Sequence, residues 1–270
     1  MSTILPGGRC RISACGRLEP VTPRRSWVQH VMGLPVSILA RGELACSAGA
    51  DAAVRAVHAE LVEVDAVFSP YRPGSAVSRL GRRELRLLDC PPEVSEVAER
   101  CEAARRRTAG AFDSLRPDGA WDPSGLVKGW AVERAARHLA AVPVDWCLNA
   151  GGDVLVLSPS GEPFGVGVQD PRDSAALVTT VQRASGAVAT SGTAARGAHL
   201  YDPRTGAAAL PALLSVTVIG PSLETADVLA TAAFVSGDPG WAAVVTAADG
   251  YEGLAVSATG QLSATRAWPR

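Results

Sequence analysis

The chain has 270 residues, of which 47% are hydrophobic and 20% are charged, and its formal net charge is −1. This length and apolar content suffice for one large domain, or for two small ones, with a sizeable core. The nearly neutral charge argues against nucleic acid as a partner, because a groove that binds phosphates needs a surplus of basic residues. The sequence has no apolar run of about 18 residues, the length that spans a bilayer, so we expect no transmembrane segment.

We expect residues 1–26 to form a flexible N-terminal arm and residues 27–270 to form a single domain. The arm is polar, and it shows neither the apolar stretch of a signal peptide nor a lipoprotein leader. The six cysteines of the chain form no CxxC pair and no metal-ligand spacing, a pattern typical of free thiols in a reducing compartment. From these features we expect a cytoplasmic protein.

The chain after the arm begins with one strand and continues mainly as helices. Residues 31–40 have strand character, although Gly33 and Pro35 interrupt it. Apolar residues at helical spacing then predict a long helix over residues 48–68. A turn-rich loop follows, and further helical segments are expected at residues 75–80, 92–108 and 128–141.

In the second half of the chain the apolar period changes to that of strands, which Gly and Pro separate. Helices first and strands later, without strict alternation, favour an α+β fold over a doubly wound parallel sheet. Two further helices are expected at residues 225–237 and 241–248. The predicted strands lie at residues 145–157, 164–169, 177–183, 187–190, 213–219, 253–257 and 262–264.

Lys128 is the only lysine in an arginine-rich chain. A lysine differs from an arginine in placing a compact ammonium on a thin stem, which suits a close contact with a ligand oxygen. Ser124, Gly125 and Gly129 flank it, and such small residues let the backbone approach a ligand and open a helix toward an anion. The alternative is a leftover lysine on a helix surface. The flanking residues favour the ligand-binding interpretation.

Asp227 and Thr231 are four residues apart in a predicted helix, so a carboxylate and a hydroxyl lie on one face and can reach one hard cation. The alternative is an aspartate that only balances the helix dipole. The patterns GxxxxGK[ST], GxGxxG and HExxH do not occur, which excludes the common nucleotide and zinc sites. Further clusters of small or polar residues lie at residues 110–113, 149–153, 189–192 and 199–206.

At these clusters the sequence resembles the ApbE-type FAD:protein FMN transferases, also called flavin transferases. The resemblance implies an ApbE-like fold with mixed or antiparallel sheets and flanking helices. It also implies Mg²⁺-dependent transfer of FMN from FAD to a Ser or Thr hydroxyl of a target flavoprotein, with release of AMP. The resemblance runs in order from about Met32 to Gly237, and it rests on residues 68–79, 110–113, 149–153, 166–171, 187–192, 199–206 and 215–219.

The resemblance also assigns roles to single residues. Asp227 and Thr231 match metal-ligating side chains, and Gly125 and Ala230 match residues whose backbone oxygens bind the metal. His199 matches the histidine proposed to deprotonate the acceptor hydroxyl, and we expect it to act in catalysis together with Lys128 and Asp227. The positions that match residues lining the FAD are Met32, Tyr71, Ala111, Phe112, Asp113, Asp122, Lys128 and Tyr201.

The sequence departs from the family pattern at several places. The lipoprotein leader is missing, the link from Asp113 to Asp122 is short, and Ser114 stands where Pro is usual. Residues 193–198 are smaller than their counterparts, which predicts a difference in acceptor recognition. Two alternative functions remain open: an FAD pyrophosphatase that hydrolyses FAD to FMN and AMP, and a non-catalytic flavin-binding module. The candidate base and metal ligands count against the second alternative.

Overall fold

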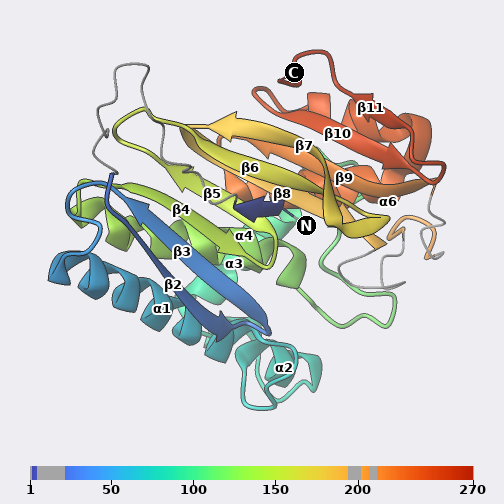
Figure 1. Cartoon of the computed structure of the whole chain (residues 1–270). Coiled ribbons are helices and arrows are strands. Elements are labelled where there is room, and N and C mark those ends of the chain that lie inside the picture. Colours follow the sequence, from blue (N-terminus) through green and yellow to red (C-terminus); the bar gives the residue numbers. More distant parts are fainter. Residues whose placement is uncertain (1, 5–21, 194–201, 207–211, 270) are drawn as a thin grey trace, which may run out of the picture.

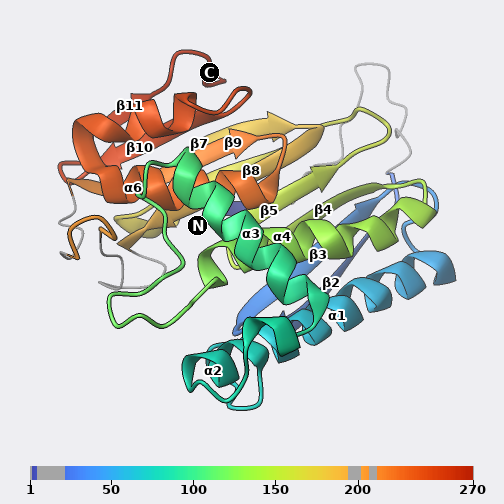
Figure 2. The same cartoon turned by 180° about the vertical axis from the view of Figure 1, so that it is seen from behind.

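The computed structural model describes residues 2–4, 22–193, 202–206 and 212–269, and these form three layers (Figures 1 and 2). A small sheet covers one face of a large antiparallel sheet, and helices cover the other face. The small sheet has the order β1-β6-β7, with β1 (Ser2–Ile4), β6 (Phe164–Asp170) and β7 (Asp173–Arg183). This arrangement confirms the predicted α+β class.

The large sheet has eight strands among the described residues, and its neighbouring strands pair antiparallel. The chain leaves it after β5, builds β6 and β7, and returns beside β5 as β8. In spatial order its strands are β11 (Leu262–Ala264), β10 (Glu252–Ser257), β9 (Leu213–Gly220), β8 (Ser185–Gly192), β5 (Asp153–Leu157), β4 (Asp145–Ala150), β3 (Leu34–Arg41) and β2 (Arg24–Val31).

The helices form the third layer, with α3 crossing outside α4 and α6 (Figure 2). Ser47 caps α1 by accepting the backbone N–H of Ala50, and Ser222 caps α6 by accepting that of Thr225. The helices are α1 (Ala48–Phe68), α2 (Ala76–Gly81), α3 (Pro92–Arg107), α4 (Ser124–Ala136) and α6 (Leu223–Thr246), with single 3₁₀ turns η1 (Leu87–Asp89) and η2 (Arg137–Ala141).

Successive side chains along the strands of the large sheet point to opposite faces, so the sheet contributes to two hydrophobic cores. In β4, Trp146 and Leu148 face the helices, whereas Cys147 between them faces the small sheet. The core on the helix side joins the large sheet to α1, α4 and α6, and the other core joins it to β6 and β7 through residues such as Val166 and Val181. The large sheet is therefore buried on both faces over its central strands.

A buried ion pair connects the large sheet to the loop that enters β6. Arg41 and Asp145 face each other on β3 and β4, 3.0 Å apart, and both are 5% exposed. Arg41 also donates to the carbonyl of Pro163 at 3.1 Å and lies over the ring of Phe164 at 4.1 Å. Asp145 accepts the hydroxyl of Ser160 at 2.7 Å. The guanidinium of Arg41 and the carboxylate of Asp145 thus both have hydrogen-bond partners in this contact.

Helix α6 is, among the described residues, the one helix long and apolar enough by length and composition to cross a membrane. In this fold it packs against β8, β9 and α4 as a core helix. Its span contains two helical segments, as predicted, separated by a kink at Gly237 and Asp238, where the backbone leaves helical geometry. Gly237 has φ of 62°, a conformation that glycine adopts without strain.

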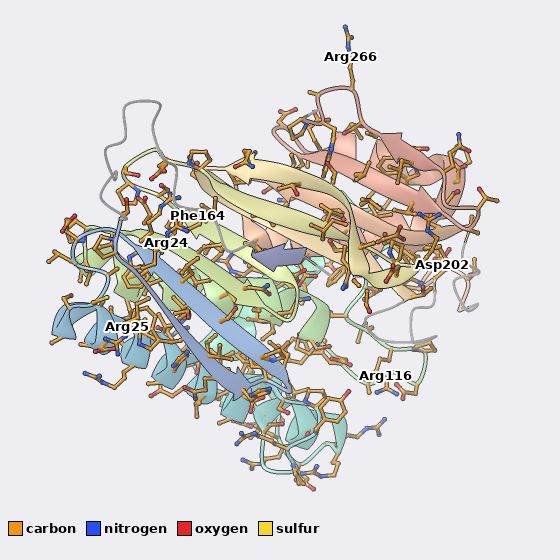
Figure 3. The ribbon with its side chains drawn as sticks, viewed as in Figure 1. Arg24, Arg25, Arg116, Phe164, Asp202 and Arg266 are labelled. Atoms are coloured by element: carbon orange, nitrogen blue, oxygen red, sulfur yellow. The ribbon has the colours of Figure 1, made fainter. Side chains whose placement is uncertain are left out.

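The start of the domain differs from the prediction. The predicted strand over residues 31–40 is the second half of a hairpin, in which Met32 and Gly33 form the turn between β2 and β3. Strand β2 begins at Arg24, inside the segment predicted as an arm, and Ser2–Ile4 form β1. Arg25 of β2 reaches Asp51 of α1 at 2.8 Å, which holds this edge strand on the helix layer (Figure 3).

The other predicted elements occur within a few residues of their expected bounds. The helix over residues 48–68 is found with the same bounds, whereas α4 begins four residues before the predicted start at residue 128. The expected strand over residues 145–157 is a hairpin that turns at Gly151 and Gly152. The described cysteines are free thiols, as expected: Cys46, Cys90, Cys101 and Cys147.

Candidate active site

Several of the predicted site residues, among them Met32, Lys128 and Asp227, lie at one end of the large sheet, where two hairpin turns lie side by side. The turn at Met32 lies beside the turn between β4 and β5, because Gly151 donates its backbone N–H to the carbonyl of Pro35 at 3.1 Å. A Cβ on Gly151 would lie 3.2 Å from the side chain of Leu34, and the φ of 62° at this position is one that glycine adopts without strain. Helix α2 lies at the same end in both views (Figures 1 and 2).

Lys128 lies between two buried carboxylates at this end of the sheet. Its Nζ is 2.5 Å from Oδ2 of Asp153 and 3.4 Å from Oδ1 of Asp227. The side chains of the two aspartates are 2% and 4% exposed, and that of Lys128 is 13% exposed. Two carboxylates and one ammonium leave a net charge of −1, which favours a further cation at this place.

A close helix crossing brings Lys128 and Asp227 together. A Cβ on Gly129 would lie 2.7 Å from the Cα of Glu224, so α4 and α6 touch backbone to backbone. One turn further along α4, Glu133 accepts the backbone N–H of Leu223 at the start of α6. This contact supplies a negative charge where the helix dipole of α6 is positive. The small size of Gly129 and the charge of Glu133 therefore determine how α4 and α6, the two helices that carry the site, pack against each other.

Asp153 and Ser191 connect the site to the strands. Oδ1 of Asp153 accepts the backbone N–H of Thr190 at 3.1 Å. The hydroxyl of Ser191 is 3.0 Å from that of Thr231 on α6. The side chains of Asp227 and Thr231 thus lie one helical turn apart, between α4 and β8.

The donor set fits magnesium better than zinc. No group of three His, Cys, Asp or Glu side chains forms a metal cage within the described ranges. A site here would use the carboxylate of Asp227, the hydroxyl of Thr231 and backbone oxygens, which are the hard ligands that Mg²⁺ prefers together with substrate phosphates. The buried carboxylate of Asp227 and the excess negative charge agree with this use. The assignment of Gly125, Ala230, Asp227 and Thr231 as ligands stays a prediction.

The segment from Gly110 to Asp122 packs against the first turn of α4 and forms one wall of the candidate site. Phe112 is 4% exposed, and its ring would lie 3.1 Å from a Cβ on Gly125. Ala111 is also buried, whereas Asp113 and Asp122 accept backbone N–H groups of Leu115 and Ser124 and shape the turns. Ser114, which replaces the usual Pro, accepts the indole N–H of Trp121 at 3.1 Å and so closes the short link.

The remaining predicted residues are placed less closely. Tyr71 lies in the loop before α2 and is 92% exposed, so in this structure its ring stacks on no other part of the described chain. His199 and Tyr201 lie outside the described residues, and their predicted roles stay predictions. The segment that follows them is near the site, because a Cβ on Gly110 would lie 3.5 Å from the side chain of Arg204. Asp202, at the start of this segment, pairs with Arg204 (Figure 3).

Two residues that contribute to this geometry were not among the predicted site residues, namely Asp153 and Glu133. Asp153 belongs to the small-residue cluster at residues 149–153, whose sequence indicates only a tight turn. Its partner Lys128 lies on another element, and nothing in the sequence pairs the two. Only the structure shows that this aspartate, which directly follows two glycines, is buried, and its burial is what identifies it as part of the site.

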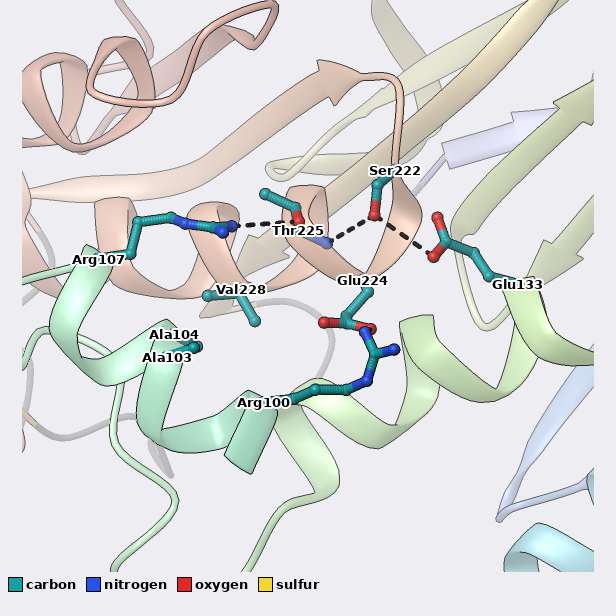
Figure 4. A pocket seen from close by; sticks show the side chains of 9 residues that line it. All are labelled: Arg100, Ala103, Ala104, Arg107, Glu133, Ser222, Glu224, Thr225 and Val228. Carbon is teal, nitrogen blue, oxygen red and sulfur yellow. Dashed lines mark hydrogen bonds and ion pairs between the residues drawn. The ribbon is translucent and has the colours of Figure 1, made fainter. Parts of the chain in front are cut away.

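A pocket of about 260 Å³ lies between α3 and the first turn of α6, and Glu133 of α4 lines part of it (Figure 4). Arg100 pairs with Glu224 at 3.0 Å, and Arg107 donates to the hydroxyl of Thr225 at 3.3 Å. Burial raises the pKa of Glu224, although Arg100 opposes this shift. None of the predicted site residues lines this pocket, and its paired charges describe a contact between helices.

A family model described as the ApbE family matches residues 32–117 and 114–255. The chain belongs to this family. The match begins at Met32, in the turn of the first hairpin, and it includes residues 110–122, Lys128, Asp153 and the region of α6 that carries Asp227. The cluster at the end of the large sheet therefore lies within the part of the chain that defines the ApbE family.

Similar proteins with curated names extend this result. An FAD:protein FMN transferase of Vibrio cholerae serotype O1 is 30% identical over an alignment of 138 residues, and the match covers 47% of this chain and 41% of the relative. The FAD:protein FMN transferase of Klebsiella pneumoniae is 31% identical over an alignment of 123 residues, and the match covers 41% of this chain and 35% of the relative. The matches thus span less than half the length of these curated relatives.

Solved structures share the fold over most of the chain. The crystal structure of the ApbE protein from Thermotoga maritima has a TM-score of 0.79 and 22% identity, and it covers 90% of this chain and 97% of its own. The flavin transferase ApbE from Vibrio cholerae has a TM-score of 0.74 and 21% identity, with the same coverage. The predicted ApbE-like fold is thereby confirmed.

Proposed function

We propose that this member of the ApbE family is a Mg²⁺-dependent FAD:protein FMN transferase, which attaches FMN from FAD to a Ser or Thr hydroxyl of a target flavoprotein and releases AMP. The observation that carries this proposal is the placement of Lys128 between the buried carboxylates of Asp153 and Asp227. Such a site suits a pyrophosphate, whose two negative charges need both an ammonium and a divalent cation. The names of the curated relatives support the same activity.

The reaction breaks the bond between the phosphorus of the FMN half and the bridging oxygen of the pyrophosphate. That oxygen leaves with AMP, and the acceptor hydroxyl oxygen takes its place on the phosphorus. When bound, Mg²⁺ would neutralise the charge that develops on the phosphate oxygens. Lys128 would hold the substrate by its phosphate oxygens and stabilise the leaving oxygen, because a fixed ammonium costs no reorganisation in a partly buried site.

The acceptor proton requires a base, and we propose His199 for that role. An imidazole with a pKa near 6.5 accepts a proton from an alcohol effectively at neutral pH. His199 precedes the described segment that begins at Asp202 by a few residues, and Arg204 in that segment lies against Gly110. The described segment next to His199 in sequence thus lies beside Gly110, which supports the proposed role.

Incubation of the purified protein with FAD, Mg²⁺ and candidate acceptor flavoproteins tests the proposal. Chromatography would measure AMP and free FMN, and intact-protein mass spectrometry would measure FMN on the acceptor. AMP together with flavinylated acceptor supports the transferase. AMP with an equal amount of free FMN, whatever acceptor is added, would instead identify the pyrophosphatase. FAD binding without AMP release would identify a non-catalytic flavin-binding module. The Asp227→Ala variant serves as the control for metal-dependent release.

A further inference from the structure

We infer that Asp153 is a positioning residue that holds the ammonium of Lys128 and thereby keeps the carboxylate of Asp227 available for a cation. The inference rests on the proposed function, since it concerns how the same site receives its anion and its metal. Its starting point is an asymmetry in the cluster. The ammonium pairs with both carboxylates, but it lies nearer to Asp153, at 2.5 Å, than to Asp227, at 3.4 Å.

Asp153 is built to stay in place. It is the first residue of β5, directly after Gly152, and it is 2% exposed. One carboxylate oxygen faces Lys128 on α4, and the other accepts the backbone N–H of Thr190 on β8. A carboxylate that is held by a backbone group of the sheet has a fixed direction, so it can orient the flexible lysine side chain.

Competition for the ammonium explains why a second carboxylate is useful. An unpaired buried ammonium is costly, so a lysine without Asp153 would turn fully to Asp227, the other carboxylate within reach. That pairing would cover the charge that a metal ion needs. With Asp153 present, Lys128 keeps a partner, and its 13% exposure leaves the ammonium accessible to a phosphate oxygen. Through Lys128, Asp153 thus affects the binding of both the metal ion and the phosphate.

Two other roles for Asp153 make different predictions. As a direct metal ligand, it would affect Mg²⁺ affinity whether or not Lys128 is present. As a purely structural residue, it would affect the melting temperature through the contact with Thr190 and leave both affinities unchanged. Only a positioning role makes the effect of Asp153 on ligand binding depend on Lys128, and a double-mutant cycle measures that dependence.

The cycle combines Asp153→Asn with Lys128→Met. Asparagine has nearly the shape of aspartate and keeps an oxygen for the N–H of Thr190, but it presents no charge to Lys128. FAD affinity is measured by flavin fluorescence with EDTA, and Mg²⁺ affinity by calorimetry without FAD. We expect Asp153→Asn to weaken both by about 10-fold in the wild-type background, the scale of one charge-assisted hydrogen bond, and by less than about 2-fold in the Lys128→Met background.

The control is Asp145→Asn, which removes another buried aspartate with a cationic partner and lies at the opposite end of β4 from the Gly151 turn. It should lower the stability of the protein, because it breaks a buried ion pair, but change neither affinity of the folded protein. Equal effects of Asp153→Asn in both backgrounds, or a lowered melting temperature with unchanged affinities, would overturn the positioning role. If Asp153→Asn does not fold, Asp153→Glu replaces it, because the longer side chain keeps the charge but displaces the carboxylate. Non-additivity with Lys128→Met is again the supporting result, and additivity the opposing one.

The two binding measurements separate this inference from the proposed function. Wild-type protein that binds Mg²⁺ but not FAD would contradict the proposed function, while the Mg²⁺ part of the cycle would still decide the role of Asp153. Wild-type protein that binds both, with affinities unaltered by Asp153→Asn, would refute the positioning role and leave the proposed transferase intact. Wild-type protein that binds neither ligand would overturn both.

Discussion

At the candidate site, both the charge and the size of a side chain decide whether it fits, and Lys128 is the clearest example. Arginine and lysine carry the same charge, yet Lys128 reaches its position between two aspartates from the first turns of α4, with Gly129 touching the backbone of α6 beside it. A planar guanidinium is wider than an ammonium and needs room for its fork. The size of the cation is therefore as important here as its charge.

Lys128→Arg should consequently lose most of the activity although the charge remains. We expect FAD turnover to fall by roughly 10²-fold or more, because a displaced cation no longer faces the leaving oxygen. Steady-state AMP release at saturating FAD and Mg²⁺ measures this effect. Turnover within about 3-fold of wild type would show that the site accepts either cation, and that the solitary lysine has no specific role.

Asp227→Ala should abolish metal-dependent turnover and leave the fold intact. Loss of a principal ligand should cost several kcal/mol of transition-state stabilisation, which is a decrease in rate of about 10³-fold. Circular dichroism and thermal melting of the variant serve as the check on folding. If AMP release at about 1 mM Mg²⁺ persists near the wild-type rate, Asp227 is no metal ligand.

At the scale of elements, the crossing of α4 and α6 decides whether Lys128 and Asp227 meet. Gly129→Ala should lower the stability by about 1–3 kcal/mol, because its Cβ would lie 2.7 Å from the backbone of Glu224 and the helices would have to separate. Chemical denaturation measures the change. Gly81→Ala is the matched control, since a Cβ on this helical glycine meets nothing within 4 Å, and it should leave stability equal or slightly higher.

A second prediction at this scale concerns the ion pair of Arg41 and Asp145, which connects β3 and β4 to the loop before β6. Burial alone would raise the pKa of Asp145, but hydrogen bonds from Ser160 and Arg41 outweigh burial and lower that pKa below its ordinary value. A carboxyl group with a lowered pKa stabilises the folded state above its unfolded pKa and ceases to do so as the pH falls through its folded pKa.

Asp145→Asn should accordingly destabilise the protein by about 3–5 kcal/mol at pH 7, because Arg41 would be left with a buried charge. The difference between the variant and the wild type should shrink below about pH 4, where the unfolded chain already binds the proton. Urea unfolding at several pH values measures both quantities. A difference that stays constant down to pH 2 would mean that the charge of Asp145 contributes nothing.

The elements themselves were predictable to different degrees. Helix α1 shows a clear helical period over its whole length, and its bounds were predicted correctly. Strand β2 was missed because it is an edge strand whose exposed side carries three polar residues, Arg24, Ser26 and His30, beside the apolar Val28, so its sequence lacks a clear apolar alternation. The site was predictable as far as motifs mark it, but the pairing of Lys128 with Asp153 depends on burial and on the meeting of two elements, neither of which a sequence displays.

For the molecule as a whole, the candidate site joins elements that are far apart in the chain. Lys128 comes from α4, Asp153 from β5, Thr190 from β8 and Asp227 from α6. A ligand that binds all of them stabilises only the assembled domain. FAD at about 100 times its dissociation constant, added to the Mg²⁺-loaded protein, should therefore add about 2.7 kcal/mol of stability and raise the melting temperature by roughly 5–10 °C.

Differential scanning fluorimetry or calorimetry measures this shift. The combination of Lys128→Met with Asp227→Ala should melt with no shift on addition of the two ligands. An equal shift in that double variant would place the binding of FAD and Mg²⁺ elsewhere in the protein.

Strand β1 has a consequence for the protein's behaviour at high concentration. It pairs antiparallel with β6, with Thr3 opposite Gly167, and so occupies the outer edge of the small sheet. Strand β6 is apolar, with Val166 and Val168 buried. Without β1, its unpaired backbone N–H and C=O groups would form an open edge that invites a strand from a second molecule. By covering this edge of β6, residues 2–4 thus reduce the tendency of the protein to aggregate.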